Sequence, residues 1–181
     1  EKFIETFSST VRQMLFFIIP ASLLFLILRA QIVRVVLGAG VFSWADTILT
    51  ADVLAFFALS FFAQALIFLL VRGYFAYQDT VTPLYTGIIS AIINIFAALY
   101  FTREFGVVGL GIAYSIWAVM NMAMLWIPLR NRVGHLDEVR ILRSLFIMTT
   151  AGLACGVVMQ VMKTVAVQFI SLDTFWGVLA Q

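Results

Sequence analysis

The chain has 181 residues, of which 64% are hydrophobic and 11% charged, with a formal net charge of +2 and a mean hydropathy of +1.09. A soluble domain is typically about 45–50% apolar and about 25% charged, and no soluble core of this size could enclose so much apolar surface. The composition therefore excludes a soluble globular domain, and the absence of a basic block argues against a nucleic-acid partner.

Apolar runs of about 18 residues or more, without the strict alternation of a membrane β-barrel, predict an all-α, polytopic transmembrane helix bundle. Five spans are expected, over about residues 12–28, 53–77, 83–101, 108–129 and 142–170. The sequence opens with neither an initiator methionine nor a signal peptide, so we expect a fragment of a longer chain.

The segment between the first two spans is too polar to cross a membrane. Apolar residues around Arg29 and Arg34 suit a segment that lies at the membrane interface. Further on, Ser43 stands three residues before Asp46, a spacing that predicts a capping box at the start of a new helix.

The second and third spans are joined by the stretch VRGYFAYQDTVTPLY, which begins at residue 71. Arg72 can extend its long side chain to the lipid headgroups. Asp79 and Thr80 can accept hydrogen bonds from the loop backbone, Thr82 is a good helix N-cap, and Pro83 suits the first helical position. We predict a tight, capped turn at a membrane face.

Orientation follows from the connection between the fourth and fifth spans, which holds the densest basic cluster in the chain: Arg130, Arg132, Arg140 and Arg143. Such clusters favour the cytoplasmic side. Alternation then places the N-terminus and the 71–85 turn on the same side. Three arginines, Arg29, Arg34 and Arg103, fall on the outer side and oppose this orientation.

Polar amides occur inside three of the spans. Gln64 lies well within the second span and needs either a partner or a water-filled cavity. Asn94 and Asn121 fall at similar depths in the third and fourth spans, which we expect to form a close antiparallel pair with both amides near the contact. The alternative is that Gln64, Asn94 and Asn121 are cavity-facing residues of a transport path.

Small residues at helical spacing mark candidate helix contacts in the membrane. Such residues are Gly87 and Ser90 in the third span, Gly111 in the fourth, and the GxxxG pair Gly152 and Gly156 in the fifth.

A search for chemistry finds no HExxH, no GxSxG and no phosphate-binding glycine loop. His135 is the only histidine and Cys155 the only cysteine, and neither has a metal-binding neighbour in sequence. We therefore predict no catalytic residues, no metal site and no cofactor.

Two segments together carry a resemblance to a known family. The first, LGAGVFSWADTILTADVLAFFALS, contains Gly40, Phe42, Asp46 and Thr47, and the second, VRGYFAYQDTVTP, contains Arg72, Asp79, Thr80, Thr82 and Pro83. With IPAS in the first span and VGLGIAYSIWAVMNMAML in the fourth, residues 3–132 resemble the MurJ (MviN) family of lipid II flippases.

The resemblance implies a fourteen-helix transporter of the multidrug/oligosaccharidyl-lipid/polysaccharide exporter superfamily, in the bacterial inner membrane, which works by alternating access in peptidoglycan biosynthesis. Residues 1–132 would be the last four helices of its second lobe. Residues 133–181 would be a basic cytoplasmic loop and the first helix of the terminal pair. The implied partners are an undecaprenyl-diphosphate-linked substrate, membrane lipids and an N-terminal lobe that carries the cavity arginines.

Two alternatives stay open. A sister transporter of the same superfamily would export a polysaccharide-linked lipid or a drug. The charges of the other lobe would decide, since several inward arginines favour a diphosphate lipid and membrane carboxylates favour cation-coupled drug export. A non-transporting scaffold or pseudotransporter would lack a second lobe altogether.

Overall fold

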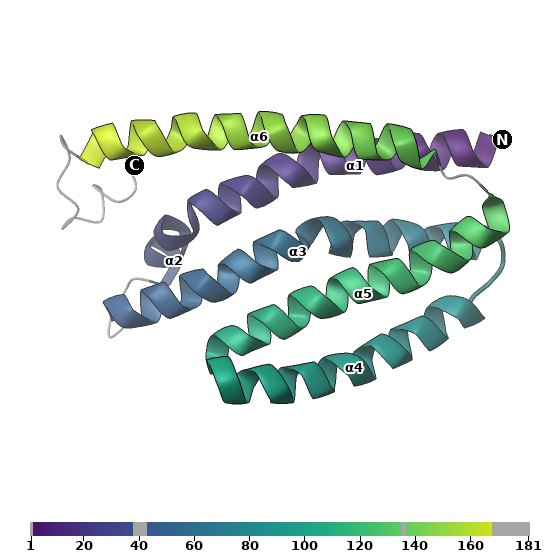
Figure 1. Ribbon diagram of the computed structural model, residues 1–181, viewed down its shortest axis with the longest axis horizontal. Helices are drawn as coiled ribbons and strands as arrows, with labels where there is room; N and C mark the ends of the chain where they lie inside the picture. Colours follow the sequence, from purple (N-terminus) through teal and green to yellow (C-terminus); the bar gives the residue numbers. More distant parts are fainter. Residues whose placement is uncertain (1, 38–42, 135–136, 168–181) are drawn as a thin grey trace.

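The computed structural model describes residues 2–37, 43–134 and 137–167, and these form a bundle of six helices with no strand in the described ranges (Figure 1). In chain order the helices are α1 (Lys2–Ile27), α2 (Arg29–Leu37), α3 (Trp44–Ala76), α4 (Val81–Phe105), α5 (Val107–Val133) and α6 (Glu138–Val167). The predicted motif residues Gly40 and Phe42 lie outside the described residues.

Every described helix except α2 is long and apolar enough to cross a membrane, which confirms the predicted all-α bundle with five spans. The helices extend beyond the predicted runs at most ends. The capping box at Ser43 and Asp46 is confirmed: each residue's side chain accepts a hydrogen bond from the other's backbone N–H. The helix it begins continues without a break into the second span, so α3 has 33 residues.

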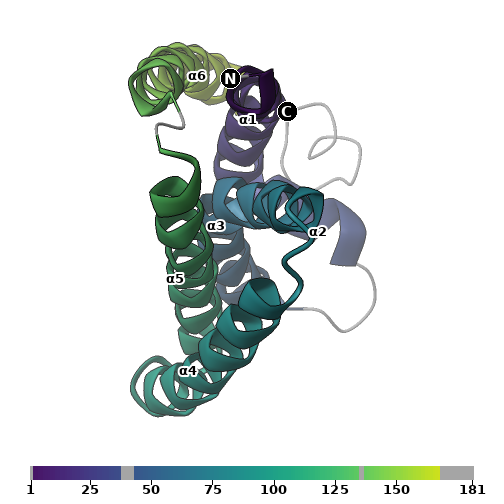
Figure 2. The same cartoon turned by 90° about the vertical axis from the view of Figure 1, so that its right-hand side faces the viewer.

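The central helix of the bundle is α3, which packs against α1, α2 and α5. The buried core lies where α1, α3 and α5 meet, and its members include Val11, Leu15, Leu70, Leu125 and Leu129. Figure 2 shows α6 beside α1 on one side of the bundle and α4 on the opposite side. The two outer helices keep long rows of apolar side chains exposed, as suits helices that face lipid or further membrane helices.

One residue connects α4 to α5. Gly106 closes α4 with φ +60°, a backbone conformation that glycine adopts without strain. At Gly109, in the first turn of α5, a Cβ atom would overlap the backbone carbonyl of Phe101 in α4. The sharp reversal of the chain therefore depends on both glycines.

The short helix α2 is held to the start of α3 by two charged contacts. The guanidinium of Arg29 lies 3.5 Å from the carboxylate of Asp52, and that of Arg34 lies 5.3 Å from the ring centre of Trp44. These contacts are at the opposite end of the bundle from the start of α1, the α3–α4 turn, the end of α5 and the start of α6, which gather at one end (Figure 1). We call the latter end the basic end, after Arg130, Arg132, Arg140 and Arg143.

Candidate functional site

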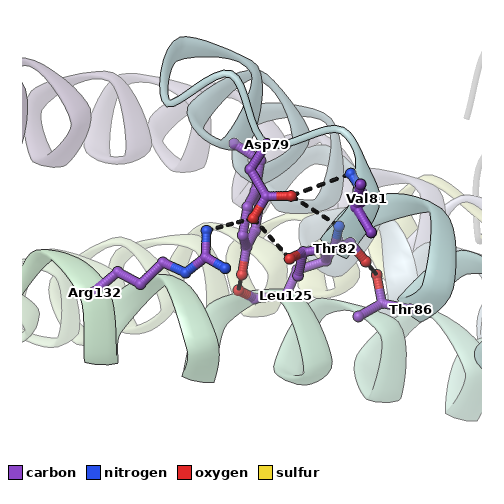
Figure 3. Close-up of polar contacts among 7 residues, drawn as sticks. Asp79, Val81, Thr82, Thr86, Leu125 and Arg132 are labelled. Atoms are coloured by element: carbon purple, nitrogen blue, oxygen red, sulfur yellow. Dashed lines mark hydrogen bonds and ion pairs between the residues drawn. The ribbon is translucent and has the colours of Figure 1, made fainter.

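Asp79 is the centre of a polar network at the basic end (Figure 3). Its Oδ1 accepts hydrogen bonds from the backbone N–H groups of Val81 and Thr82, at 3.1 and 2.9 Å. Its Oδ2 accepts from the Thr82 hydroxyl at 2.7 Å and from the guanidinium of Arg132. One carboxylate thus caps α4 and ties the α3–α4 turn to the end of α5.

This geometry corrects the prediction for the start of α4. The helix begins at Val81 and not at Pro83, and the carboxylate of Asp79 satisfies the first N–H groups in place of Thr82 as N-cap. Pro83 becomes the third helical residue, where its missing N–H still costs no helical hydrogen bond. The Thr82 side chain instead donates back to Asp79. Thr80 makes no side-chain cap.

The network holds the carboxylate of Asp79 in its charged form. Hydrogen bonds from the backbone and side chain of Thr82, with a smaller effect of Arg132, lower the pKa of Asp79 from 3.8 to about 2. Asp79 is therefore ionised at every physiological pH. Arg72, in the same sequence motif, is exposed and joins no ion pair among the described residues.

Tyr74 adds a second link between α3 and α5 beneath this network. Its side chain is fully buried, and its hydroxyl donates a 2.8 Å hydrogen bond to the backbone carbonyl of Leu125. Sequence reasoning found neither the contact of Tyr74 with α5 nor Arg132 as the partner of Asp79. Neither long-range pairing has a signal in local spacing.

Two further carboxylates hold the start of α6. Asp137 accepts from the Ser8 hydroxyl of α1 at 3.4 Å and from Arg140 at 3.2 Å. Glu138 pairs with Arg130 of α5 at 2.8 Å. At the basic end, acidic residues therefore link different helices and turns through hydrogen bonds and ion pairs.

Gln64 has protein partners on both sides of its amide. Its Nε2 donates to the Ser60 hydroxyl at 2.8 Å, and its Oε1 accepts from the Tyr114 hydroxyl of α5 at 3.2 Å. Ser115 adds a 2.6 Å hydrogen bond to the carbonyl of Phe56. The structure therefore gives Gln64 the partner that its depth in the membrane requires.

The expected Asn94–Asn121 contact is not what joins α4 to α5. The two helices do pack as an antiparallel pair, and their side-chain hydrogen bond runs from the Trp117 indole to the buried Ser90 hydroxyl at 3.2 Å. Asn94 is half-exposed and makes no hydrogen bond with any described residue. Asn121 is buried, and its Oδ1 has no partner within the described part of the chain.

Gly111, the predicted helix contact of α5, faces α3. A Cβ atom at Gly111 would lie 3.3 Å from the Cβ of Phe56 and from the carbonyl oxygen of Val53. The reason is that α5 runs beside the central helix along its whole length, with Tyr114 and Leu125 on that same face. Gly87 of α4 has open space beside it.

The GxxxG glycines of α6 lie against α1. A Cβ atom at Gly152 would overlap the Leu23 side chain, and one at Gly156 would lie 2.6 Å from the Cδ1 of Ile27. Near the start of α3, Asp46 acts in the capping box and the buried Thr47 donates to the Ser43 carbonyl at 3.1 Å. In the described ranges no three His, Cys, Asp or Glu side chains gather as a metal site would need.

Comparison with known proteins identifies the family. The family described as "Lipid II flippase MurJ" matches residues 1–180. The chain belongs to the MurJ family. A probable lipid II flippase MurJ from Vibrio cholerae is 33% identical over 124 residues, which are 68% of this chain and 24% of that protein. A lipid II flippase MurJ from Thermosipho africanus is 26% identical over 118 residues, 65% of this chain and 25% of that protein.

The fold is also that of the MurJ family. A solved lipid II flippase MurJ in its inward closed conformation superposes with a TM-score of 0.71 at 22% identity, covering 96% of this chain and 34% of that one. The chain spans about a quarter of the length of the curated MurJ relatives it matches. It is a multi-pass membrane protein of a family named for transporters and not for catalytic enzymes.

Proposed function

We propose that this chain forms part of a flippase that moves the lipid-linked peptidoglycan precursor, lipid II, from the inner to the outer leaflet of the bacterial inner membrane. The observation that carries the proposal is the family match along residues 1–180. The superposition of 96% of the chain on a MurJ fold supports it. A diphosphate headgroup cannot cross hydrocarbon unaided, so the transporter must offer a polar cavity that opens to alternate sides.

Within such a transporter, residues 1–132 supply four helices of the second lobe, and residues 133–181 supply the basic loop and the first helix of the terminal pair. The buried meeting of α1, α3 and α5 and the links at Asp79 and Tyr74 suit a lobe that moves as one body. Rigid-body rocking of one repeat against another is a common route to alternating access.

Asp79 has a structural role in this proposal, since its hydrogen bonds to described residues go to the first turn of α4 and to Arg132 of α5. Asn94 and Asn121 are our candidates for cavity-facing residues. Gln64 is the weakest of the three candidates because both ends of its amide already have protein partners.

The test is replacement in a bacterial cell depleted of its own lipid II flippase. The full-length gene product that carries these residues is expected to restore growth and to make newly synthesised precursor accessible to a hydrolase added outside spheroplasts. If the protein inserts into the membrane but the precursor stays inaccessible to the hydrolase, a sister exporter or a non-transporting scaffold is favoured. An unrelated membrane protein without transport activity, produced in the same cells, is the control for the effect of expression itself.

A further inference from the structure

We propose that a recess between α1 and α6 binds the phosphate of an anionic phospholipid from the leaflet at the basic end. The recess has a volume of about 510 Å³ and is lined by Ser9, Arg12, Gln13, Phe16, Phe17, Ser144 and Met148. This occupant is a bulk membrane lipid and not the cargo, so the inference goes beyond the proposed function.

The lining is amphiphilic along the membrane normal. Ser9, Arg12 and Gln13 lie nearer the basic end, and Phe16 and Phe17 lie a turn deeper on the same helix. On α6, Ser144 faces the polar part and Met148 follows one turn deeper. A phosphate with an acyl chain beneath it has the same order of polar and apolar groups.

Arg12 supplies the charge complementarity. Its Nε donates to the Ser8 carbonyl at 3.4 Å. The two terminal amino groups of the guanidinium have no acceptor among the described residues. Arg12 is half-buried and forms no ion pair with a described carboxylate. A guanidinium with free N–H groups presents a fork that matches two phosphate oxygens.

The neighbouring charges leave the recess cationic. On α6, Arg143 forms no ion pair in the described ranges, whereas Arg140 and Glu138 are each engaged by an opposite charge. Glu5 lies two turns before Arg12 on α1, outside the lining and without contact to Arg12. Anionic lipid attracts basic side chains at a membrane surface by about 1 kcal/mol each, or about fivefold in affinity.

The experiment uses the full-length gene product in phosphatidylcholine nanodiscs that contain a photoactivatable phosphatidylglycerol at increasing mole fraction. Mass spectrometry of the labelled peptides reports the yield at residues 9–17 and 144–148. We expect saturable labelling there and little from the matched phosphatidylcholine probe. Arg12→Gln should raise the half-saturating fraction about fivefold. Arg12→Lys keeps the charge but loses the fork, so its half-saturating fraction should lie between those of the wild type and Arg12→Gln. Both variants should elute as the wild type does.

Arg72→Gln is the control for general attraction, because it removes an exposed arginine at the basic end that does not line the recess. Equal weakening by Arg72→Gln and Arg12→Gln would overturn the proposal, as would equal labelling by the two phospholipid probes. A polyprenyl phosphate probe that labels the recess and is not displaced by phosphatidylglycerol would assign it to cargo-like lipids and overturn the proposal too. Precursor export is measured in a separate assay, so a failure of the proposed function can be told apart from a failure of the recess to bind phospholipid.

Discussion

The carboxylate of Asp79 in the α3–α4 turn binds the guanidinium of Arg132 near the end of α5, although 53 residues separate them in the sequence. The same carboxylate caps α4 through Val81 and Thr82. Local helix initiation and long-range helix packing therefore depend on one side chain.

Separating these two roles requires two substitutions. Asp79→Asn keeps an oxygen for the N–H groups of α4 but loses the charge that binds Arg132, so it should lower the unfolding temperature less than Asp79→Ala. Arg132→Gln should resemble Asp79→Asn. Thermal unfolding in detergent checks the order, with Arg143→Gln as the control because Arg143 makes no ion pair with a described residue. An Asp79→Ala variant as stable as Asp79→Asn would contradict the capping role.

The pH dependence of stability should report the same carboxylate. The folded-state pKa of Asp79, about 2, lies below its ordinary value of 3.8, so the ionised form is favoured by folding. Its contribution should be fully present above about pH 4 and should disappear as the pH falls through about 2. The difference in unfolding temperature between wild type and Asp79→Asn should shrink over that range. A difference that stays constant from pH 6 to pH 2 would exclude this source of stability.

Tyr74→Phe removes only the hydroxyl that donates to the Leu125 carbonyl. We expect a loss of about 1 kcal/mol in the free energy of unfolding, because a buried hydrogen bond between α3 and α5 disappears. Tyr77→Phe is the matched control, since Tyr77 is exposed and packs through its ring against Phe3. Equal effects of the two substitutions would refute a special role for the Tyr74 hydroxyl.

Gln64 and Tyr114 should be energetically coupled. In a double-mutant cycle of Gln64→Leu and Tyr114→Phe, we expect a coupling of about 0.6 kcal/mol, the average for hydrogen bonds between membrane helices. The cycle is measured by reversible unfolding in mixed micelles. Strictly additive losses of unfolding free energy would show that the two side chains do not interact. Gln64 would then be as strong a cavity-facing candidate as Asn94 and Asn121.

Two glycines of the α4–α5 hairpin should respond oppositely to alanine. Gly109→Ala places a Cβ on the backbone of Phe101, which cannot move without opening the turn, and should cost more than about 2 kcal/mol. Gly87→Ala enters open space within a helix and should be neutral or stabilising by up to about 1 kcal/mol. Expression level and unfolding temperature measure both. A tolerated Gly109→Ala would mean that the hairpin is looser than described.

Features set by local chemistry could be predicted from the sequence. Span number follows from the lengths of the apolar runs, and the capping box at Ser43 and Asp46 follows from a three-residue spacing. Helix ends were less accurate because amphipathic residues outside the apolar runs, such as Trp44 and Arg132, continue the helices into the interface.

Features set by packing could not be predicted in this way. A stripe of small residues shows that a helix has a close neighbour but not which helix that is, so the sequence could not predict that Gly111 faces α3. Likewise Thr82 is a good N-cap in isolation, yet the helix begins earlier because the carboxylate of Asp79 accepts from the N–H groups of Val81 and Thr82 and has Arg132 as a further partner. The unpartnered Oδ1 of the buried Asn121 has no counterpart in any local pattern.

The most direct measurement is leaflet exchange of lipid II by the purified full-length gene product in proteoliposomes. Labelled lipid II is placed in one leaflet, and its accessibility to a membrane-impermeant hydrolase on the other side is followed over time. We predict transfer well above protein-free vesicles, with no matching transfer of a labelled phosphatidylcholine. Transfer no faster than in empty vesicles, by folded protein, would contradict a role for this chain in lipid II transport.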